Sequence, residues 1–202
     1  MAAILGVDTI QHTNGTTAVT VGTNGSVTAA GTVTAGGVIT GDGSGLTNLN
    51  IGTTGKILQM VNVQNGAYAS GTSVIPFGNT IPQITEGTEV MTLNITPSSA
   101  SNKLQIQVVA NGSRSNQGDV VFALFVGSTA NALICSNIFS DANWRQNHTL
   151  NYFMTAGTTS QLTFRLRGGG AGASTFAFNG YAGNSLFGGV YLSSITITEL
   201  AA

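Results

Sequence analysis

Alternation of apolar and polar residues in five separate segments is the feature that most constrains the fold of this chain. The segments are residues 56–63, 90–95, 103–109, 162–167 and 193–200. Successive side chains of a strand point to opposite faces, so this period predicts strands with one buried face. In residues 162–167, LTFRLR, we expect Leu162, Phe164 and Leu166 to face the core.

A sixth segment, VVFALFV at residues 120–126, is apolar on both faces and predicts a central strand or one covered by a neighbour. Turn-rich stretches at residues 96–102, 111–119 and 167–174 separate the strands. Three Asn-Gly pairs, beginning at Asn14, Asn24 and Asn111, are interpreted as hairpin tips. About eight strands spaced in this way predict an all-β fold, an antiparallel, jelly-roll-like β-sandwich whose edges trimerisation would protect.

The N-terminal region has a different period. An apolar residue recurs every six positions, at Val21, Val27, Val33 and Ile39, with Gly, Thr and Ala between. This favours an extended Gly/Thr-rich arm, or a β-stalk of short strands and tight corners for which three chains would supply the missing faces. A flexible Gly/Thr linker is the alternative interpretation. An arm lying along another protein is compatible with the stalk, because charges are sparse here.

A glycine-rich joint, GDGSGLTNLN at residues 41–50, separates the two regions. Its alternating glycines favour a corner, and Leu46 and Leu49 give the corner two apolar anchors. We therefore predict two parts: an anchoring arm or stalk at residues 1–50 and a β-sandwich knob at residues 51–202.

The scarcity of charge predicts assembly. Charged residues make up 6% of the sequence, against about 25% in typical proteins, so we expect other subunits to cover much of the surface. A net charge of −1 argues against nucleic acid and anionic lipid as partners. Cys135 is the one cysteine, so no disulfide is expected within the chain. We also expect no export signal, no membrane insertion and no span.

The sequence predicts no catalytic, metal or cofactor site. Glu86 and Glu89 are the one close carboxylate pair, and beside a turn they are interpreted as exposed, solubilising charges. Neither His12 nor His148 has an orienting partner nearby in sequence, as a Ser/His/Asp site would need. The histidines and the cysteine lack metal-ligand spacing, and no phosphate-binding loop is present. We therefore expect a protein that is not an enzyme.

One polar and aromatic cluster, DANWRQNHT at residues 141–149, is a candidate glycan site. An aromatic face with planar polar neighbours suits a sugar, and Trp144 with Asn143, Arg145 and Asn147 could provide both. The alternative, which we favour, is that Trp144 packs into the sandwich or a subunit interface while Arg145 pairs with Asp141.

Two loops, residues 111–119 and 167–185, are further candidate contact surfaces. The second combines Phe176, Phe178, Tyr181 and Phe187 with many glycines, which suits a trimer axis or a mobile binding loop.

Several segments resemble virion surface proteins of tailed bacteriophages, especially phages of aquatic bacteria such as cyanophages. GKILQMV, MTLNITPSSASNKLQIQV and VYLSSITITEL are similar to a C-terminal β-sandwich module of these proteins. VDTIQHTNGTTAVTV and GDGSGLTNL are similar to segments of phage fibres and head-decorating proteins. The resemblance covers nearly the whole chain.

The resemblance implies a homotrimer on the virion surface, with an N-terminal anchor and a C-terminal knob, made in the host cytoplasm. We expect a capsid cement or decoration protein whose arm clamps the major capsid protein on the capsid exterior. The alternative is a short tail fibre or fibre tip that binds a host surface glycan. A third class, a cytokine-like or complement-like trimeric ligand, would also be expected to have a jelly-roll fold. We expect no secretion signal in this sequence, which argues against that class.

Overall fold

The computed structural model describes residues 9–11, 17–21, 23, 26–30 and 54–202. The chain divides into two compact units, Met1–Leu49 and Asn50–Ala202, which we call the N-terminal unit and the sandwich unit. The described residues of the N-terminal unit form a small antiparallel sheet of β1 (Thr9–Gln11), β2 (Thr17–Val21) and β3 (Val27–Ala29).

Of the six residues predicted to anchor or oligomerise, Val21 and Val27 are register partners across β2 and β3. Val33, Ile39, Leu46 and Leu49 lie outside the described residues. The six-residue spacing of the first two valines therefore corresponds to antiparallel pairing across a short connection. The Asn-Gly pairs at 14–15 and 24–25 fall between paired strands and also lie outside the described residues.

The regular elements in the described part of the sandwich unit are all strands except for a single 3-10 turn, η2 (Phe187–Gly189), which precedes the last strand. The strands are β4 (Ile57–Asn65), β5 (Ala69–Gly71), β6 (Thr88–Ile95), β7 (Lys103–Arg114), β8 (Gly118–Val126), β9 (Ile134–Ser140), β10 (Gln146–Thr155), β11 (Leu162–Gly170), β12 (Phe176–Phe178), β13 (Gly180–Tyr181), β14 (Asn184–Ser185) and β15 (Ser193–Leu200).

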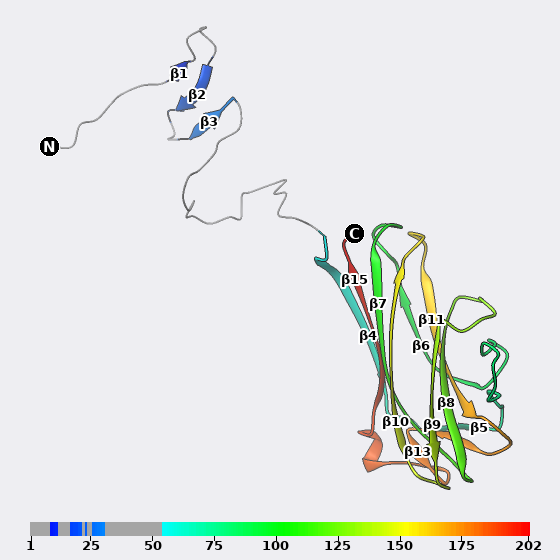
Figure 1. The fold of residues 1–202 in the computed structure, drawn as a ribbon. Coiled ribbons are helices and arrows are strands. Elements are labelled where there is room, and N and C mark those ends of the chain that lie inside the picture. The colour runs from blue at the N-terminus through cyan, green and yellow to red at the C-terminus, as the bar shows by residue number, and fades with distance from the viewer. Residues whose placement is uncertain (1–8, 12–16, 22, 24–25, 31–53) are drawn as a thin grey trace. The chain divides into compact units, whose positions relative to one another are not determined.

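Eight long strands of the sandwich unit form two antiparallel sheets packed face to face (Figure 1). One sheet has the order β4-β15-β7-β10, and the other has the order β6-β11-β8-β9. Numbered along the chain, these strands run 1-8-3-6 in one sheet and 2-7-4-5 in the other, which is the connectivity of a jelly roll. The predicted all-β, jelly-roll-like sandwich is confirmed.

The short strands β12 and β5 extend the first sheet beyond the end of β15. β12 pairs with the last residues of β7, Gly112–Arg114, and β5 pairs with β12. Phe176 and Phe178 of β12 are fully buried between the sheets. The prediction that these two rings form a trimer axis or a mobile loop is therefore wrong, because they fill the core of their own chain.

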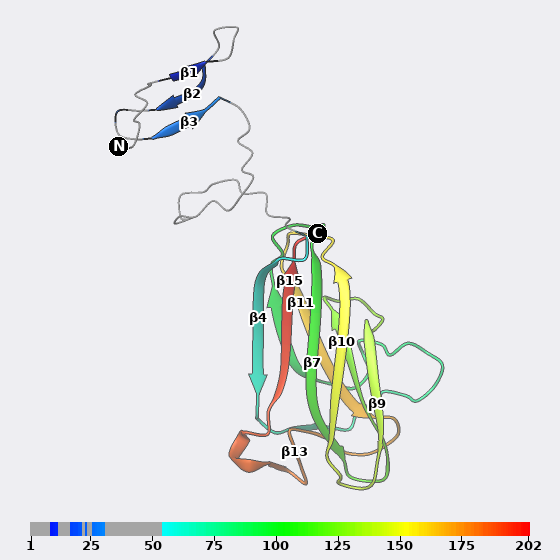
Figure 2. The ribbon, with the colours of Figure 1, turned by 60° about the vertical axis from the view of Figure 1, so that its left-hand side comes forward.

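The two ends of the sandwich unit's described chain meet at one end of the sandwich. The amide of Gly55 donates to the carbonyl of Ala201, and the amide of Ala201 donates to the carbonyl of Lys56, both at 2.9 Å. β13 and the β9–β10 connection lie at the opposite end, which we call the tip (Figure 2). The tip is thus the end farthest from the point where the chain leads to the N-terminal unit.

The core lies between the two sheets and follows the alternation seen in the sequence. Phe164 and Leu166 are fully buried, and Leu162 packs against them, as predicted for the 162–167 segment. Phe122 lies in the middle of an aromatic cluster in this core. Its ring contacts the rings of His148 and Phe176 edge-on, at centroid distances of 4.9 and 5.5 Å. Edge-to-face contacts of this kind add to the free energy gained from burial.

β8 is buried on both faces, as its apolar sequence predicted. Val121, Ala123 and Phe125 point away from the main core and form a second apolar cluster with Ile75. Ile75 belongs to the long β5–β6 connection, residues 72–87, whose backbone is fixed by a bond from the Ile75 amide to the Gly170 carbonyl. This connection covers the outer face of the second sheet.

Two predicted loops are partly wrong because β7 and β11 run further than turn-forming residues suggested. Asn111 and Gly112 lie within β7 and not at a hairpin tip. A Cβ on Gly112 would lie 2.9 Å from the ring of Phe122, so the glycine makes room for the core. Residues 168–170 belong to β11, where a Cβ on Gly169 would lie 2.7 Å from the carbonyl oxygen of Ser73. Close packing, and not a turn, requires these glycines.

Candidate functional site

The tip brings together chain segments that are far apart in the sequence. The β9–β10 connection supplies the residues 141–145 that the sequence singled out, and the β13–β14 hairpin approaches them. The guanidinium carbon of Arg145 lies 5.5 Å from the ring centroid of Tyr181, which is a cation–π contact. This contact joins the two segments at the end of the sandwich.

Within this chain, Trp144 is not packed into the sandwich and Arg145 is not paired with Asp141, contrary to the interpretation that we favoured from the sequence. Trp144 is 64% exposed, so it does not pack into its own sandwich. Arg145 makes no ion pair with Asp141 in the described structure; the carboxylate of Asp141 accepts a bond from Gln117 Nε2 at 2.8 Å. The backbone turn is fixed instead, since the amide of Asn143 donates to the carbonyl of Arg114 at 2.7 Å.

A hollow of about 370 Å³ lies beside this contact, and we call it the tip hollow. Polar side chains and small residues line it: Tyr68, Ser113, Arg114, Ser115, Asn143, Thr175, Ala177, Ala182 and Gly183. Asn143 and Ala182 both have left-handed backbone angles, with φ of 62° and 49°. Residues other than glycine hold this conformation at a cost, and such residues gather at functional sites.

Asn147, the fourth predicted glycan residue, is not part of the tip hollow. It lies on β10, and its Nδ2 donates to Asn111 Oδ1 at 2.8 Å. The backbone N–H of Asn111 donates to Ser193 Oγ, and the Ser193 hydroxyl in turn donates to Asn179 Oδ1 at 2.6 Å. Asn111, Ser193 and Asn179 are buried, and Asn147 joins their hydrogen-bond network from the exposed surface of β10.

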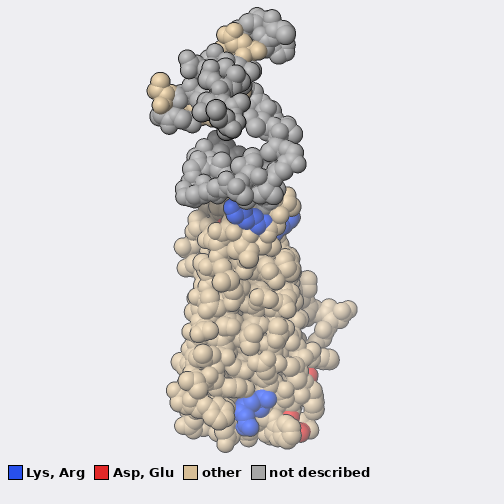
Figure 3. All heavy atoms as spheres, turned by 90° about the vertical axis from the view of Figure 1, so that its left-hand side faces the viewer, with Lys and Arg blue, Asp and Glu red and all other residues tan. Residues whose placement is uncertain are grey.

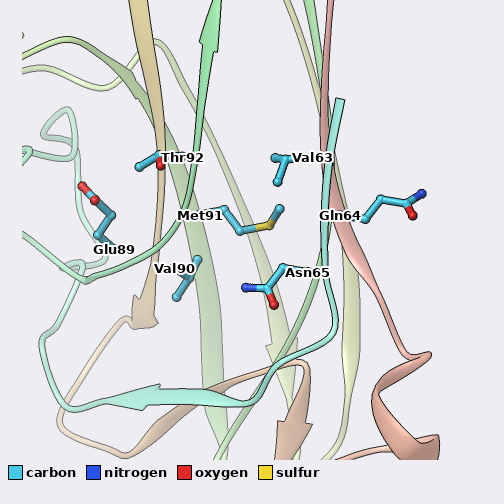
Figure 4. A pocket seen from close by; sticks show the side chains of 7 residues that line it. All are labelled: Val63, Gln64, Asn65, Glu89, Val90, Met91 and Thr92. Carbon is cyan, nitrogen blue, oxygen red and sulfur yellow. The ribbon is translucent and has the colours of Figure 1, made fainter. Parts of the chain in front are cut away.

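A second hollow, of about 360 Å³, lies between the edge strands β4 and β6 (Figure 4). Met91 points across it toward Val63, whereas Glu89 and Gln64 point away. The Glu89 carboxylate forms ion pairs with Arg165 at 3.2 Å and with Arg167 at 3.6 Å. Glu89 is therefore paired with two arginines, and it is not an isolated solubilising charge as the sequence suggested.

His148 lies in the core and not at the surface. It is fully buried, and its Nδ1 lies 3.1 Å from the hydroxyl oxygen of Ser136 on β9. Its Nε2 has no hydrogen-bond partner among the described residues. Burial lowers the pKa of His148 to about 4, so the ring is neutral at pH 7. Without access for a substrate or a carboxylate in contact with the ring, the pair does not form the arrangement of a Ser/His/Asp site.

This burial predicts a pH-dependent stability. The unfolded chain protonates His148 near pH 6.5 and the folded chain only near pH 4, so the stability present above pH 6.5 is lost as the pH falls. Between pH 7.5 and pH 5 we expect His148 to cost about 2 kcal/mol of unfolding free energy. Urea denaturation at the two pH values measures the loss. The His148→Leu variant should show no such loss, and an equal slope in both proteins would contradict the assignment.

The outer face of the β4-β15-β7-β10 sheet carries almost no charge. Its central row consists of cross-strand neighbours Asn62, Thr196, Gln107 and Asn151. We call the whole surface the neutral face, and its residues are Leu58, Met60, Asn62, Gln64, Ser194, Thr196, Thr198, Leu200, Lys103, Gln105, Gln107, Val109, Asn147, Thr149, Asn151, Phe153 and Thr155.

Lys103 is the single charged member of the neutral face, and it lies at the end of the sheet where the interior strand β7 begins. Its Nζ donates to Thr155 Oγ1 at 2.7 Å. Figure 3 shows blue atoms near the two ends of the sandwich and an uncharged area between them. The neutral face includes exposed apolar side chains, among them Met60 at 66% and Phe153 at 59% exposure.

Within the described ranges, no group of three or more His, Cys, Asp or Glu residues is placed to hold a metal ion. No helix in that part of the chain is long and apolar enough to cross a membrane.

No family model and no curated protein sequence matches this chain. Solved structures similar to the chain include three of different kinds. A CBM36 carbohydrate-binding module in complex with calcium and xylotriose has 13% identity over 68% of this chain and 98% of its own, with a TM-score of 0.34. The Eiger TNF protein of S. frugiperda has 11% identity over 70% and 93%, with a TM-score of 0.39. The infectious bursal disease virus Gx strain has 13% identity over 71% and 38%, with a TM-score of 0.33.

Carbohydrate-binding modules and a viral particle protein are therefore among the structures similar to this β-sandwich. At these identities and TM-scores the likeness assigns no ligand and no partner to this chain. The jelly-roll assignment rests on the strand order of the two sheets.

Proposed function

We propose that this chain is a non-enzymatic structural protein of a virion surface, a homotrimeric decoration protein of a bacteriophage capsid. In this proposal the N-terminal unit anchors the protein to the major capsid protein, and the sandwich unit is displayed outward. The observation that carries the proposal is the neutral face, which supports self-association. The resemblance of the sequence to phage virion proteins supports the location.

The neutral face suits contact between copies because association there removes almost no charge from water. Burying an unpaired charge costs several kcal/mol, whereas Asn, Gln, Thr and Ser can exchange hydrogen bonds with the same residue types on a partner. Exposed Met60 and Phe153 would add apolar contact area. Because only 6% of the residues are charged, the chain has few charges that could attract partners of opposite charge.

Sedimentation equilibrium of the full chain tests the trimer. We expect the wild type to sediment as a trimer and the double variant Gln107→Glu with Thr196→Glu as a monomer at micromolar concentration. These residues are register partners, so the variant places two like charges side by side within the neutral face. A monomeric wild type, or a double variant that remains trimeric, would overturn the proposed interface.

A matched control for this test lies on the other sheet. Asn94 and Thr163 are register partners of β6 and β11, and the pair Asn94→Glu with Thr163→Glu adds the same charge outside the neutral face. We expect this control to remain trimeric. Circular dichroism of both variants shows whether the sandwich has folded.

Location on the virion is tested by the copy number per particle, measured by quantitative mass spectrometry against the major capsid protein. Hundreds of copies, in a simple ratio to the shell subunit, would support capsid decoration by symmetry. Deletion of residues 1–40 should then leave a folded trimer that no longer binds the capsid. Binding by the truncated protein would contradict an anchoring N-terminal unit.

A second candidate function is that of a short tail fibre or fibre tip that binds a host surface glycan. Trp144 favours it, because this large ring is 64% exposed at the end of the sandwich opposite the connection to the N-terminal unit. A copy number of a few to tens per particle would favour this candidate over capsid decoration.

A further inference from the structure

We propose that the tip binds an acidic glycan, with Arg145 pairing to a sugar carboxylate and the tip hollow receiving neighbouring sugar hydroxyls. The inference rests on the second candidate function and names its ligand class. It concerns a different surface from the neutral face, so it is compatible with capsid decoration as well.

Arg145 is an exposed cation without a carboxylate partner. Both ion pairs of the described residues involve Glu89, at Arg165 and Arg167, and Asp141 is already bonded to Gln117. The guanidinium carbon of Arg145 lies 5.5 Å from the ring centroid of Tyr181, and the Arg145 side chain makes no hydrogen bond within the described part of the chain. The N–H groups along its edge stay available for the two parallel bonds that a carboxylate accepts.

Aromatic residues lie near this cation. Trp144 precedes it, and Tyr181 is 37% exposed beneath it. Burial raises the pKa of Tyr191 while the positive charge of Arg145 lowers it, so Tyr191 also lies within electrostatic reach. Aromatic rings beside a charged donor match a sugar that presents an apolar C–H face and a carboxylate.

The tip hollow offers polar groups of the kind that hydrogen-bond sugar hydroxyls. Tyr68, Ser115 and Thr175 bring hydroxyl groups, and Asn143 brings an amide, while small residues leave space between them. The guanidinium of Arg114 is occupied elsewhere: its Nη1 donates to the carbonyl of Asp119 at 3.0 Å, and its Nε and Nη2 donate to Asn116. Of the arginines at the tip, Arg145 is thus the one available for a carboxylate.

Saturation-transfer difference NMR on the full chain tests the ligand class. The probes are D-glucuronic acid and N-acetylneuraminic acid, and the controls are D-glucose and the methyl ester of D-glucuronic acid. We expect transfer to both acids, weakening as NaCl is raised, and at least tenfold less affinity for the ester and for glucose. Arg145→Gln should remove this preference, and Trp144→Ala should weaken binding of the acids at least tenfold.

Phe77→Ala is the matched control, because Phe77 is 74% exposed in the β5–β6 connection and not at the tip hollow. We expect it to bind like the wild type. Equal binding of acids, ester and glucose, with no effect of Arg145→Gln, would overturn the acidic class and leave glycan binding in place. Transfer to none of the sugars would overturn both, whereas the trimer is decided separately by sedimentation.

Discussion

Replacing Phe122 by alanine should lower the free energy of unfolding by about 3–5 kcal/mol, the largest effect we expect from a single substitution. The ring is fully buried and packs edge-on against His148, Phe176 and Phe178. The rigid backbone of β7 beside it, at Gly112, cannot move in to fill the space because it is bonded to β10 and β12. Urea denaturation at one fixed protein concentration, followed by circular dichroism, measures the loss.

Phe77→Ala serves as the control for Phe122→Ala, since it removes the same atoms from a side chain that is 74% exposed. We expect a change within about 0.5 kcal/mol. A loss for Phe77→Ala as large as that for Phe122→Ala would mean that ring burial between the sheets does not determine stability.

Glu199→Gln should cost about 2–3 kcal/mol, because the change replaces a buried acceptor that several donors surround. The carboxylate accepts bonds from Asn102 Nδ2 at 2.6 Å, from the amide and hydroxyl of Ser98, each at 2.8 Å, and from Gln59. Burial alone raises the pKa of Glu199, but these bonds lower it to about 2. A glutamine that keeps its oxygen toward Asn102 and Ser98 would turn its N–H groups toward the Nε2 donor of Gln59, which is also bonded to the Thr96 carbonyl.

The stability that Glu199 contributes depends on pH. The folded pKa of about 2 lies below the usual value of 4.5, so the stabilising contribution is complete above pH 4.5 and is lost as the pH falls toward 2. Glu89→Gln is the matched control, because its ion pairs are partly exposed and should contribute less than 1 kcal/mol. Equal losses for Glu199→Gln and Glu89→Gln, measured by urea denaturation, would show that the donors around Glu199 do not matter.

The sequence predicted those strands whose two faces differ in polarity. The 193–200 segment matches β15 at both ends, and the 162–167 segment lies within β11. β9 was missed because both of its faces mix apolar and polar residues: Ser136 points inward to His148, and Phe139 is 62% exposed. Glu199 occupies a buried position of a correctly predicted strand, and its partner Ser98 lies 101 residues away. No local pattern indicates such a contact.

The candidate site was predicted in part. The composition of residues 141–149 singled out Trp144 and Arg145, and the structure places both at the exposed tip. The segments 111–119, 141–149 and 167–185, which the sequence analysis named as candidate contact surfaces, supply every lining residue of the tip hollow except Tyr68. That these segments meet Tyr68, which precedes β5, was not predicted, because only the jelly-roll topology brings them together. The Gly-rich 180–189 segment forms the β13–β14 hairpin and η2.

The pairing of the sandwich unit's first strand with its last has a mechanical consequence. β4 starts at the end of the sandwich where the chain enters and runs toward the tip, hydrogen-bonded to β15 along almost its whole length. Tension between residue 54 and a load held at the tip would act parallel to β4. The bonds from β4 to β15 would then share the load in shear and would not open one after another. The same topology that closes the jelly roll thus makes the unit resistant to pulling along its long axis.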